Sequence, residues 1–468
     1  MDDKDKSPGE LLQERLILKP QNSGIAMSEE ETGKAMAFCE PYKDFLDCAK
    51  TERRAVRHTV ELLEKNGYKP YEPRKKYAAG DKVYINNRGK ALLFAAIGTK
   101  PLAEGVNIVA SHIDSPRIDL KPRPLYEEAQ LAMLKTHYYG GVRKYQWVAL
   151  PLALHGVVVK KDGETVDVTV GEDDGDPIFC INDLLPHLSK EQNQRKLHEG
   201  IRGEELNILV GSLPFRDDKA SEKVKLNIMQ ILNEKYGIIE EDFLSAELTM
   251  VPAHKARDLG FDRSMIGAYG HDDRVCAYTS LAASLELPAP ERTWVNILAD
   301  KEETGSEGNT GLQSRFLEYF LMDLAEARGE SGREALQHSR CLSADVNAAY
   351  DPTFPEVAEK KNTAYISYGV CITKYTGSGG KSSTNDASAE FMGEMRRLLD
   401  ASGVQWQTGE LGKVDQGGGG TVAKYISKLG ADVIDIGVPV LSMHAPLEVV
   451  SKLDVYSCYR AFAAFLRS

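Results

Sequence analysis

The feature that most restricts the fold of this chain is a repeated alternation of short apolar strands and helical stretches in its second half. Apolar segments suited to strands occur at residues 293–298, 339–344 and 432–438, and patterns typical of helices lie between or after them. Strands that alternate with helices usually pair in parallel, because each crossover returns the chain to the same end of the sheet. The alternation predicts an α/β sandwich with a largely parallel sheet.

The same sheet is expected to begin before residue 111. Ser28 and Glu31 form a capping box that predicts a helix start, and residues 51–65 place apolar side chains on one helical face. Residues 83–97 contain two apolar runs around a turn, which predicts a hairpin, and residues 106–110 form a short apolar run typical of a buried strand. Two helices and three strands are therefore expected in this part of the chain.

The central part of the chain has a different pattern. Residues 165–170 alternate polar and apolar side chains, which is typical of a half-buried strand, and residues 223–236 form an amphipathic helical pattern within a strongly charged stretch. We interpret residues 117–254 as an inserted, β-rich domain. The α/β domain is then discontinuous and consists of residues 1–116 and 255–468.

Composition and charge exclude several classes of protein. The chain has 468 residues, of which 42% are apolar and 27% charged, and this balance excludes a wholly disordered or coiled-coil protein. Lys and Arg number 58 and Asp and Glu number 70, so the net charge of −12 repels phosphate backbones and argues against nucleic-acid binding. No segment approaches the roughly 18 consecutive apolar residues of a membrane span, so no membrane interaction is expected.

Cysteine spacing and the N-terminal residues indicate the compartment. The seven cysteines lie far apart without a CxxC pair, which is typical of reduced thiols and not of a disulfide framework or a thiolate zinc site. Residues 1–25 are mostly polar, contain no apolar run after a basic start, and are expected to be only partly ordered. These features together predict a cytoplasmic protein.

Imidazoles and carboxylates follow the predicted strands at the points where the strands end. In open α/β sheets, ligands bind outside the carboxyl ends of the strands, so these side chains are expected to meet at one edge. Another acidic group precedes the apolar helix expected at residues 275–285. The side chains concerned are His112 and Asp114, Glu302 and Glu303, Asp345, His444, and Asp272 with Asp273 before the helix.

Two imidazoles with several carboxylates and no sulfur form a ligand set suited to Zn²⁺, Mn²⁺ or Co²⁺. Two ions fit this set better than one, because a carboxylate such as Asp272 can bridge ions about 3.5–4 Å apart. Of the adjacent pair Glu302 and Glu303, one can bind metal while the other acts as a general base. Asp114 can accept the second ring N–H of His112 and so fix its tautomer.

Each of these features alone has an ordinary structural explanation. A lone His112 or His444 is more often a core or surface histidine, and an acidic pair before a helix is more often a cap. Gly379-Gly380-Lys381-Ser382 resembles the end of a phosphate-binding loop, but the glycine required five positions before Gly380 is replaced by Tyr375. The coincidence of four clusters at strand ends with a fifth before a helix favours the metal site.

Five motifs carry a resemblance to a known family. 'ASHIDSPRIDLKP', 'GHDDRVCAY', 'DKEETGSEG', 'SADVNAAYDP' and 'GVPVLSMHAP' occur in the order and spacing of the aspartyl aminopeptidase family of dinuclear zinc metallopeptidases. The resemblance extends from about residue 31 to the C-terminus. It implies a three-layer α/β/α catalytic domain interrupted by a β-rich dimerisation domain, and a tetrahedral homododecamer built from dimers.

The resemblance also implies roles for individual residues and two divalent metal ions per subunit, zinc in this family. His112, Asp272 and Asp345 would hold one ion, and Asp272, Glu303 and His444 the other, with Glu302 as the general base and Asp114 as the partner of His112. His187 resembles a histidine of the inserted domain that reaches the active site of a neighbouring subunit. Lys374 matches a lysine that contacts an acidic substrate side chain. Both are substrate-binding candidates.

The function implied is a metalloaminopeptidase that removes an N-terminal Asp or Glu from peptides through a metal-bound hydroxide. Eukaryotic members have an Asp-Asn pair at the position of Asp272-Asp273, so this chain is closer to the prokaryotic branch. A preference for Leu or another neutral N-terminal residue is therefore left open. A dinuclear deacylase or carboxypeptidase would use the same ligands. A binding protein on an inactive peptidase would need a missing ligand, and none of the expected positions is lost.

Overall fold

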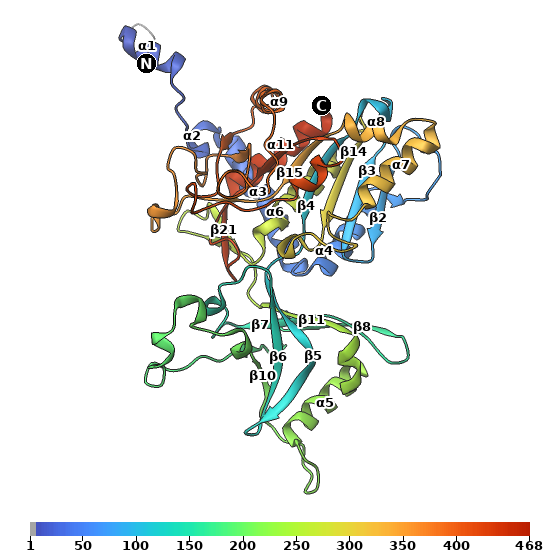
Figure 1. Cartoon of the computed structure of the whole chain (residues 1–468), viewed down its shortest axis with the longest axis vertical. Helices are drawn as coiled ribbons and strands as arrows, with labels where there is room; N and C mark the ends of the chain where they lie inside the picture. Colours follow the sequence, from blue (N-terminus) through green and yellow to red (C-terminus); the bar gives the residue numbers. More distant parts are fainter. Residues whose placement is uncertain (1–5) are drawn as a thin grey trace.

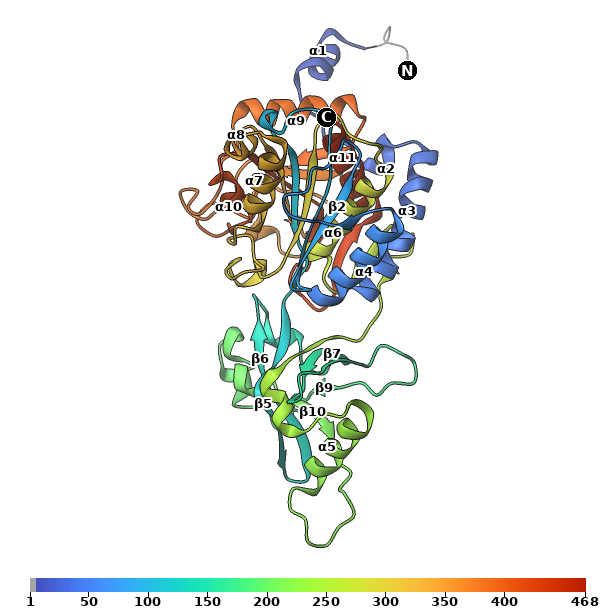
Figure 2. The ribbon, with the colours of Figure 1, turned by 90° about the vertical axis from the view of Figure 1, so that its right-hand side faces the viewer.

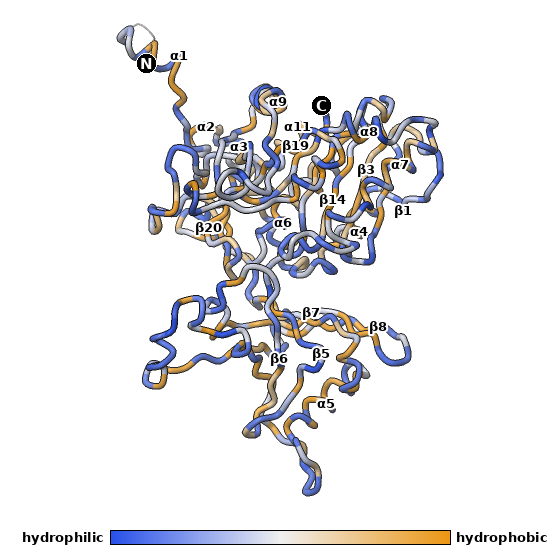
Figure 3. The backbone as a smooth tube through the Cα atoms, viewed as in Figure 1, coloured by the Kyte–Doolittle hydropathy of each residue, from blue (hydrophilic) through white to orange (hydrophobic). Residues whose placement is uncertain are grey.

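The computed structural model describes residues 6–468, which form two bodies joined by a narrow connection (Figure 1). The larger body contains a nine-stranded sheet and the smaller one a seven-stranded sheet. Figure 3 shows apolar residues along the strands of both bodies and hydrophilic residues in the surrounding loops. Each sheet therefore has its own apolar core.

The central strands of the larger sheet are parallel. β14 pairs with β4, β4 with β15, and β15 with β19, all in parallel, while the hairpin β2–β3 joins β14 antiparallel at one side. The four central strands therefore end at the same edge. In spatial order the strands are β1 (Lys69–Pro70), β2 (Lys82–Asn87), β3 (Ala91–Ala96), β14 (Trp294–Ala299), β4 (Asn107–His112), β15 (Arg340–Ala344), β19 (Asp432–Gly437), β17 (Val370–Thr373) and β18 (Trp406–Thr408).

Helices cover both faces of this sheet, which confirms the three-layer α/β/α fold (Figure 2). Alternate residues of β3 point to opposite faces: Leu92 and Phe94 join one buried cluster, and Leu93 and Ala95 join another. The helices that pack on the first face are α3 (Glu29–Cys48), α4 (Glu52–Lys65), α6 (His271–Glu286), α9 (Ala389–Ala401) and α11 (Lys452–Arg467). Those on the second are α7 (Phe316–Arg328), α8 (Gly332–Gln337) and α10 (Ala423–Ser427).

The smaller body is built on an antiparallel sheet with a separate core, against which α5 (Lys223–Tyr236) packs. Its strands, in spatial order, are β8 (Thr165–Val170), β7 (Leu152–Val159), β11 (Ala246–Pro252), β5 (Arg117–Glu128), β6 (Leu131–Tyr139), β10 (Ile208–Gly211) and β9 (Cys180–Ile181). A third sheet lies near the connection and contains β12 (Arg257–Leu259), β13 (Met265–Ala268), β21 (Glu448–Ser451), β20 (Pro439–Leu441) and β16 (Asn347–Ala348).

Ion pairs hold the two bodies together. The buried ammonium of Lys50 bonds Glu172 Oε2 at 2.9 Å, and Arg117 Nη1 bonds Glu52 Oε2 at 2.9 Å. Both carboxylates are largely shielded from water, so breaking either pair would leave a charge without its partner. The orientation of the smaller body relative to the larger one is therefore determined by specific contacts.

Most locally predicted elements are present. The helix start at Ser28, the hairpin β2–β3, the strand β8 and the helix α5 all lie where their patterns predict them. The residues before Ser28 differ from expectation, because α1 (Pro8–Leu16) and α2 (Ser23–Ala26) are helical there. A capping box at Ser7 explains α1, and residues 1–5 lie outside the described part of the chain. Between residues 6 and 468, no helix combines the length and apolar character needed to cross a bilayer.

Two identical helix caps give a matched test of what stabilises the larger body. Ser28 caps α3, which buries Tyr42, Phe45 and Leu46, whereas Ser7 caps α1, which buries no residue. We predict that Ser28→Ala lowers the free energy of unfolding by about 1 kcal/mol, because a main-chain donor loses its acceptor at a helix joined to the core. Urea denaturation measures this change. Ser7→Ala should leave the transition unchanged, and equal losses in the two variants would contradict the prediction.

Candidate metal centre

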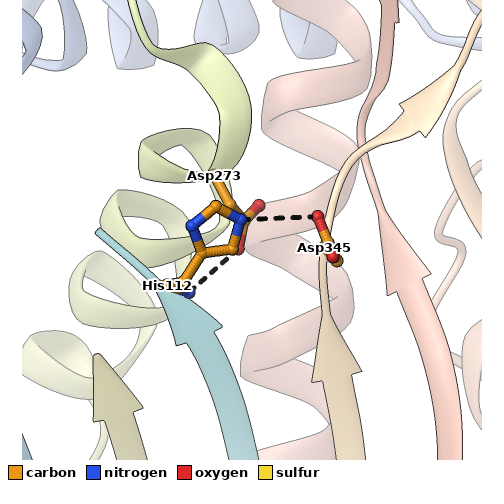
Figure 4. Close-up of side chains that lie close together, drawn as sticks. All are labelled: His112, Asp273 and Asp345. Carbon is orange, nitrogen blue, oxygen red and sulfur yellow. Dashed lines mark hydrogen bonds and ion pairs between the residues drawn. The ribbon is translucent and has the colours of Figure 1, made fainter. Parts of the chain in front are cut away.

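Seven of the predicted site residues meet at the edge where the central strands end. His112 is the last residue of β4, Asp345 follows β15, and Glu302 and Glu303 lie in a short 3₁₀ turn after β14. Asp272 comes from the start of α6, His444 from the loop after β20, and Asp114 from the segment after β4. Figure 4 shows His112 at the end of its strand, pointing toward Asp345 and lying beside Asp273.

Asp272 lies between the two imidazoles and directs one oxygen to each. Its Oδ1 is 3.1 Å from His112 Nε2, and its Oδ2 is 3.2 Å from His444 Nε2. Asp345 Oδ1 lies 3.7 Å from His112 Nε2, and Glu303 Oε2 lies 3.6 Å from His444 Nε2. The ligand atoms thus form two neighbouring groups that share Asp272.

The tautomers of both imidazoles are determined by main-chain carbonyls. His112 Nδ1 lies 3.0 Å from the carbonyl oxygen of Asp114, and His444 Nδ1 lies 3.2 Å from that of Gly141. Because a carbonyl oxygen only accepts hydrogen bonds, each Nδ1 must carry a hydrogen and donate it. Each Nε2 is then the ring nitrogen that can exchange a proton for a metal ion, and both point into the carboxylate cluster.

The cluster has an excess of buried negative charge, which suits a divalent cation. Oε1 of Glu303 is buried without a hydrogen-bond partner, and Oδ1 of Asp272 has only the imidazole of His112 beside it, with Nε2 3.1 Å away. Burial raises the pKa of Glu303 well above its ordinary value, and the negative charge of Asp272 raises it further. Burial would lower the pKa of His444, but its hydrogen bond to Asp272 and the charge of Glu303 raise it to about 10. Unpaired oxygens beside imidazole nitrogens are the donor set expected for zinc.

Asp114 has a wider role than the predicted contact with His112. Its Oδ1 lies 3.3 Å from His112 Nδ1 and accepts the main-chain N–H of Glu302 at 3.1 Å. Its Oδ2 accepts the N–H of Glu303 at 3.2 Å and the hydroxyl of Tyr139 at 2.8 Å. Burial would raise the pKa of Asp114, but the hydrogen bonds from His112 and Tyr139 hold it below its ordinary value. One carboxylate therefore orients residues from three parts of the chain.

The side chain of Glu302 has a higher pKa than that of an ordinary glutamate. Ligand atoms of Glu302, Glu303 and His112 lie within 4.8 Å of one another. Burial raises the pKa of Glu302 to about 8, and the charges of Asp345 and Asp272 act in the same direction. A carboxyl group that can hold a proton near neutral pH is suited to general acid–base catalysis.

Two further carboxylates belong to the centre but were not assigned roles from the sequence. Glu448 accepts the main-chain N–H of Asp272 at 3.0 Å and that of His444 at 2.6 Å, and so it orients both residues. Asp273 accepts the main-chain N–H of His112 at 3.3 Å and groups with His112 and Asp345 as a possible ligand (Figure 4). The adjacency of Asp273 to Asp272 was the available signal, whereas Glu448 offered only its position four residues after His444.

The two substrate-binding candidates lie outside this cluster. His187 is exposed in a loop of the smaller body, between exposed Leu185 and Leu188. Lys374 follows β17 and pairs with the carboxylate of Asp386. Among the described residues, neither side chain forms a hydrogen bond or ion pair with a residue of the metal centre.

Known proteins resemble this chain over nearly its whole length. The family model described as aminopeptidase I zinc metalloprotease (M18) matches residues 45–466. A probable M18 family aminopeptidase 1 of Clostridium acetobutylicum is 51% identical over 97% of this chain and 99% of the relative. The crystal structure of an M18 aminopeptidase from Thermotoga maritima superposes with a TM-score of 0.92, at 44% identity over 96% of this chain and 99% of that one.

A more distant likeness is to the mApe1 dodecamer of S. cerevisiae, which has 22% identity and a TM-score of 0.74 over 92% of this chain and 96% of that one. At this identity the likeness shows the fold alone. The match to the family model and the identity to the clostridial relative both cover nearly the whole chain, and they confirm the resemblance carried by the five motifs. The chain belongs to the M18 family of aminopeptidase I zinc metalloproteases and is a zinc-dependent aminopeptidase.

Proposed function

We propose that this enzyme removes the N-terminal residue of peptides with two divalent ions per subunit, which Asp272 bridges. The observation that carries the proposal is the placement of the two Asp272 oxygens, 3.1 Å and 3.2 Å from the Nε2 atoms of different histidines. His112 and Asp345 would complete one ion site, and Glu303 and His444 the other. Zn²⁺ is the expected ion, and Co²⁺ or Mn²⁺ also suits these oxygen and nitrogen ligands.

The chain's own residues provide the proton transfers. Bound ions of this kind polarise a carbonyl group and lower the pKa of water. Glu302 would take a proton from the attacking water on a carboxylate oxygen and then give it to the leaving amine. Its position supports this role, because ligand atoms of Glu302 lie within 4.8 Å of those of Glu303 and His112, and burial raises its pKa above the ordinary value. Asp114 would orient Glu302 through its main-chain N–H.

The preferred substrate is proposed to have Asp or Glu at its N-terminus. The net charge of −12 would repel acidic peptides, so local cations must provide the preference. Lys374 and Lys381 both pair with Asp386, and two ammonium groups on one carboxylate leave one positive charge uncompensated. This excess charge supports Lys374 as the residue that binds an acidic side chain.

The assembly is proposed to be a cytoplasmic homododecamer built from dimers through residues 117–254. Around His187, the side chains of Leu184, Leu185 and Leu188 are 49%, 50% and 68% exposed. Neighbouring apolar side chains exposed to this extent are typical of a protein–protein interface. Burial of this loop against a second copy would bring His187 toward the substrate of that subunit. All seven cysteines are free thiols, which supports a reducing compartment.

Replacement of the general base should greatly slow turnover without loss of metal. Glu302→Gln keeps the shape of the side chain but cannot accept a proton, so we expect kcat to fall by about 10²–10⁴-fold. Steady-state kinetics on an aminoacyl substrate measures the change, and metal analysis by mass spectrometry establishes that the ions are retained. Glu307→Gln, an exposed glutamate in the same loop, serves as the control. Turnover of metal-loaded Glu302→Gln at the rate of the control would disprove the role.

Metal binding should release protons and weaken as the pH falls. The pKa values of His112 and His444 are raised, the latter to about 10, so both rings are protonated at neutral pH before metal binds. An incoming ion displaces these protons, and lowering the pH favours the protonated rings. Calorimetry in buffers of different ionisation enthalpy should show proton release and two ions per subunit. His444→Ala should bind one ion; a wild-type stoichiometry of one would exclude the bridged pair.

The acidic preference can be tested separately from the mechanism. We expect the wild-type kcat/KM to be higher for substrates with N-terminal Asp or Glu than for those with Leu. Lys374→Met should reduce kcat/KM about tenfold or more for the acidic substrates only, because the attractive charge is lost. A panel of aminoacyl substrates measures both effects. Lys428→Met is a control, because Lys428 is an exposed lysine at the C-cap of α10. A wild-type preference for Leu would remove the acidic specificity and leave the mechanism unaffected.

A further inference from the structure

We propose that Tyr139, a residue of the smaller body, is a positioning residue for the metal centre and acts through Asp114. Tyr139 is the last residue of β6, and its hydroxyl donates to Asp114 Oδ2 at 2.8 Å. Asp114 in turn contacts His112 and the main chain of the Glu302–Glu303 turn. The inference rests on the proposed function, because it concerns how the same ligands are oriented.

The hydroxyl of Tyr139 has no ready substitute. Asp114 is fully buried, with 0% of its surface exposed, so solvent cannot easily replace a lost donor. Its two oxygens accept from Tyr139 and from two main-chain N–H groups, with the ring nitrogen of His112 close to one of them. Removal of the hydroxyl would leave Oδ2 with the N–H of Glu303 as its remaining donor. The carboxylate could then rotate and displace His112 and the turn that contains Glu302.

The tyrosine ring is itself held at the junction of the two bodies. The guanidinium of Arg117 stacks over the ring with its centre 4.1 Å from the ring centroid. Arg117 bonds Glu52 of α4 in the larger body at 2.9 Å and Asp119 of β5 in the smaller body at 2.8 Å. A stacked arginine with two carboxylate partners restricts the ring to one position. Burial also raises the pKa of Tyr139, so its hydroxyl remains a donor.

The two residues after Tyr139 contact the other half of the centre. The carbonyl oxygen of Gly141 accepts from His444 Nδ1, and a Cβ atom at Gly140 would lie 3.3 Å from Glu303 Oε2. The φ angle of Gly140 is +75°, a conformation that side chains disfavour. Residues 139–141 therefore contact both Asp114, which lies beside His112, and His444 itself. Through this segment the placement of the smaller body determines the orientation of both imidazoles.

Adjacent tyrosines allow a matched experiment on the full-length protein. Tyr139→Phe removes only the hydroxyl that reaches Asp114, whereas Tyr138→Phe makes the same change in a ring that is 39% exposed. The readouts are zinc affinity by chelator competition, the visible spectrum of the Co²⁺-loaded protein, and Tm. We expect Tyr139→Phe to weaken zinc binding about tenfold or more and to alter the cobalt spectrum, because the orientation of His112 changes. Tyr138→Phe should match the wild type.

Arg117→Lys provides a second variant, since it keeps the charge but loses the planar stack over Tyr139. Measured at the same pH, Arg117→Lys should also weaken zinc binding, as Tyr139→Phe does. Wild-type zinc affinity and cobalt spectra in both Tyr139→Phe and Arg117→Lys would overturn the inference while the proposed function stands. A wild-type protein that binds no divalent ion would overturn the proposed function and this inference with it.

Discussion

Buried negative charge is the constraint on which the rest of this structure depends. Carboxylates removed from water are costly unless they are paired with cations or hydrogen-bond donors. Here Asp114 and Glu448 are satisfied by donors from the chain itself, whereas Glu303 retains a buried oxygen without a hydrogen-bond partner and Asp272 directs its two oxygens to the imidazoles of His112 and His444. The protein thus stabilises the carboxylates that orient the cluster, and under the proposed function those that face the imidazoles would hold the metal ions.

The sheet brings these charges together. Parallel pairing aligns His112 at the end of β4 with Ala299 at the end of β14, so the turn with Glu302 begins beside His112. The next parallel strand, β15, ends one residue before Asp345. Residues separated by about two hundred positions in the sequence therefore meet at one edge, as expected for ligand sites of open α/β sheets. The smaller body then completes the centre with the carbonyl of Gly141 and the hydroxyl of Tyr139.

Features that depend on local sequence could be predicted, and those that depend on long-range contacts could not. The strand ends identified His112 and Asp345, because an apolar run followed by a polar residue is visible without a structure. The donors around Asp114 could not be found in this way, since Tyr139 belongs to another sheet and the two N–H groups belong to the main chain. Glu448 was missed for the same reason: its partners are main-chain groups of Asp272 and His444.

Asp272 is proposed to bridge two ions held by different histidines. Anomalous diffraction at the zinc absorption edge, from crystals of the zinc-loaded enzyme, tests it most directly. Two peaks about 3.5–4 Å apart are expected, one bound to His112 Nε2 and the other to His444 Nε2, with one oxygen of Asp272 on each. A single peak, or two peaks of which Asp272 contacts only one, would contradict it.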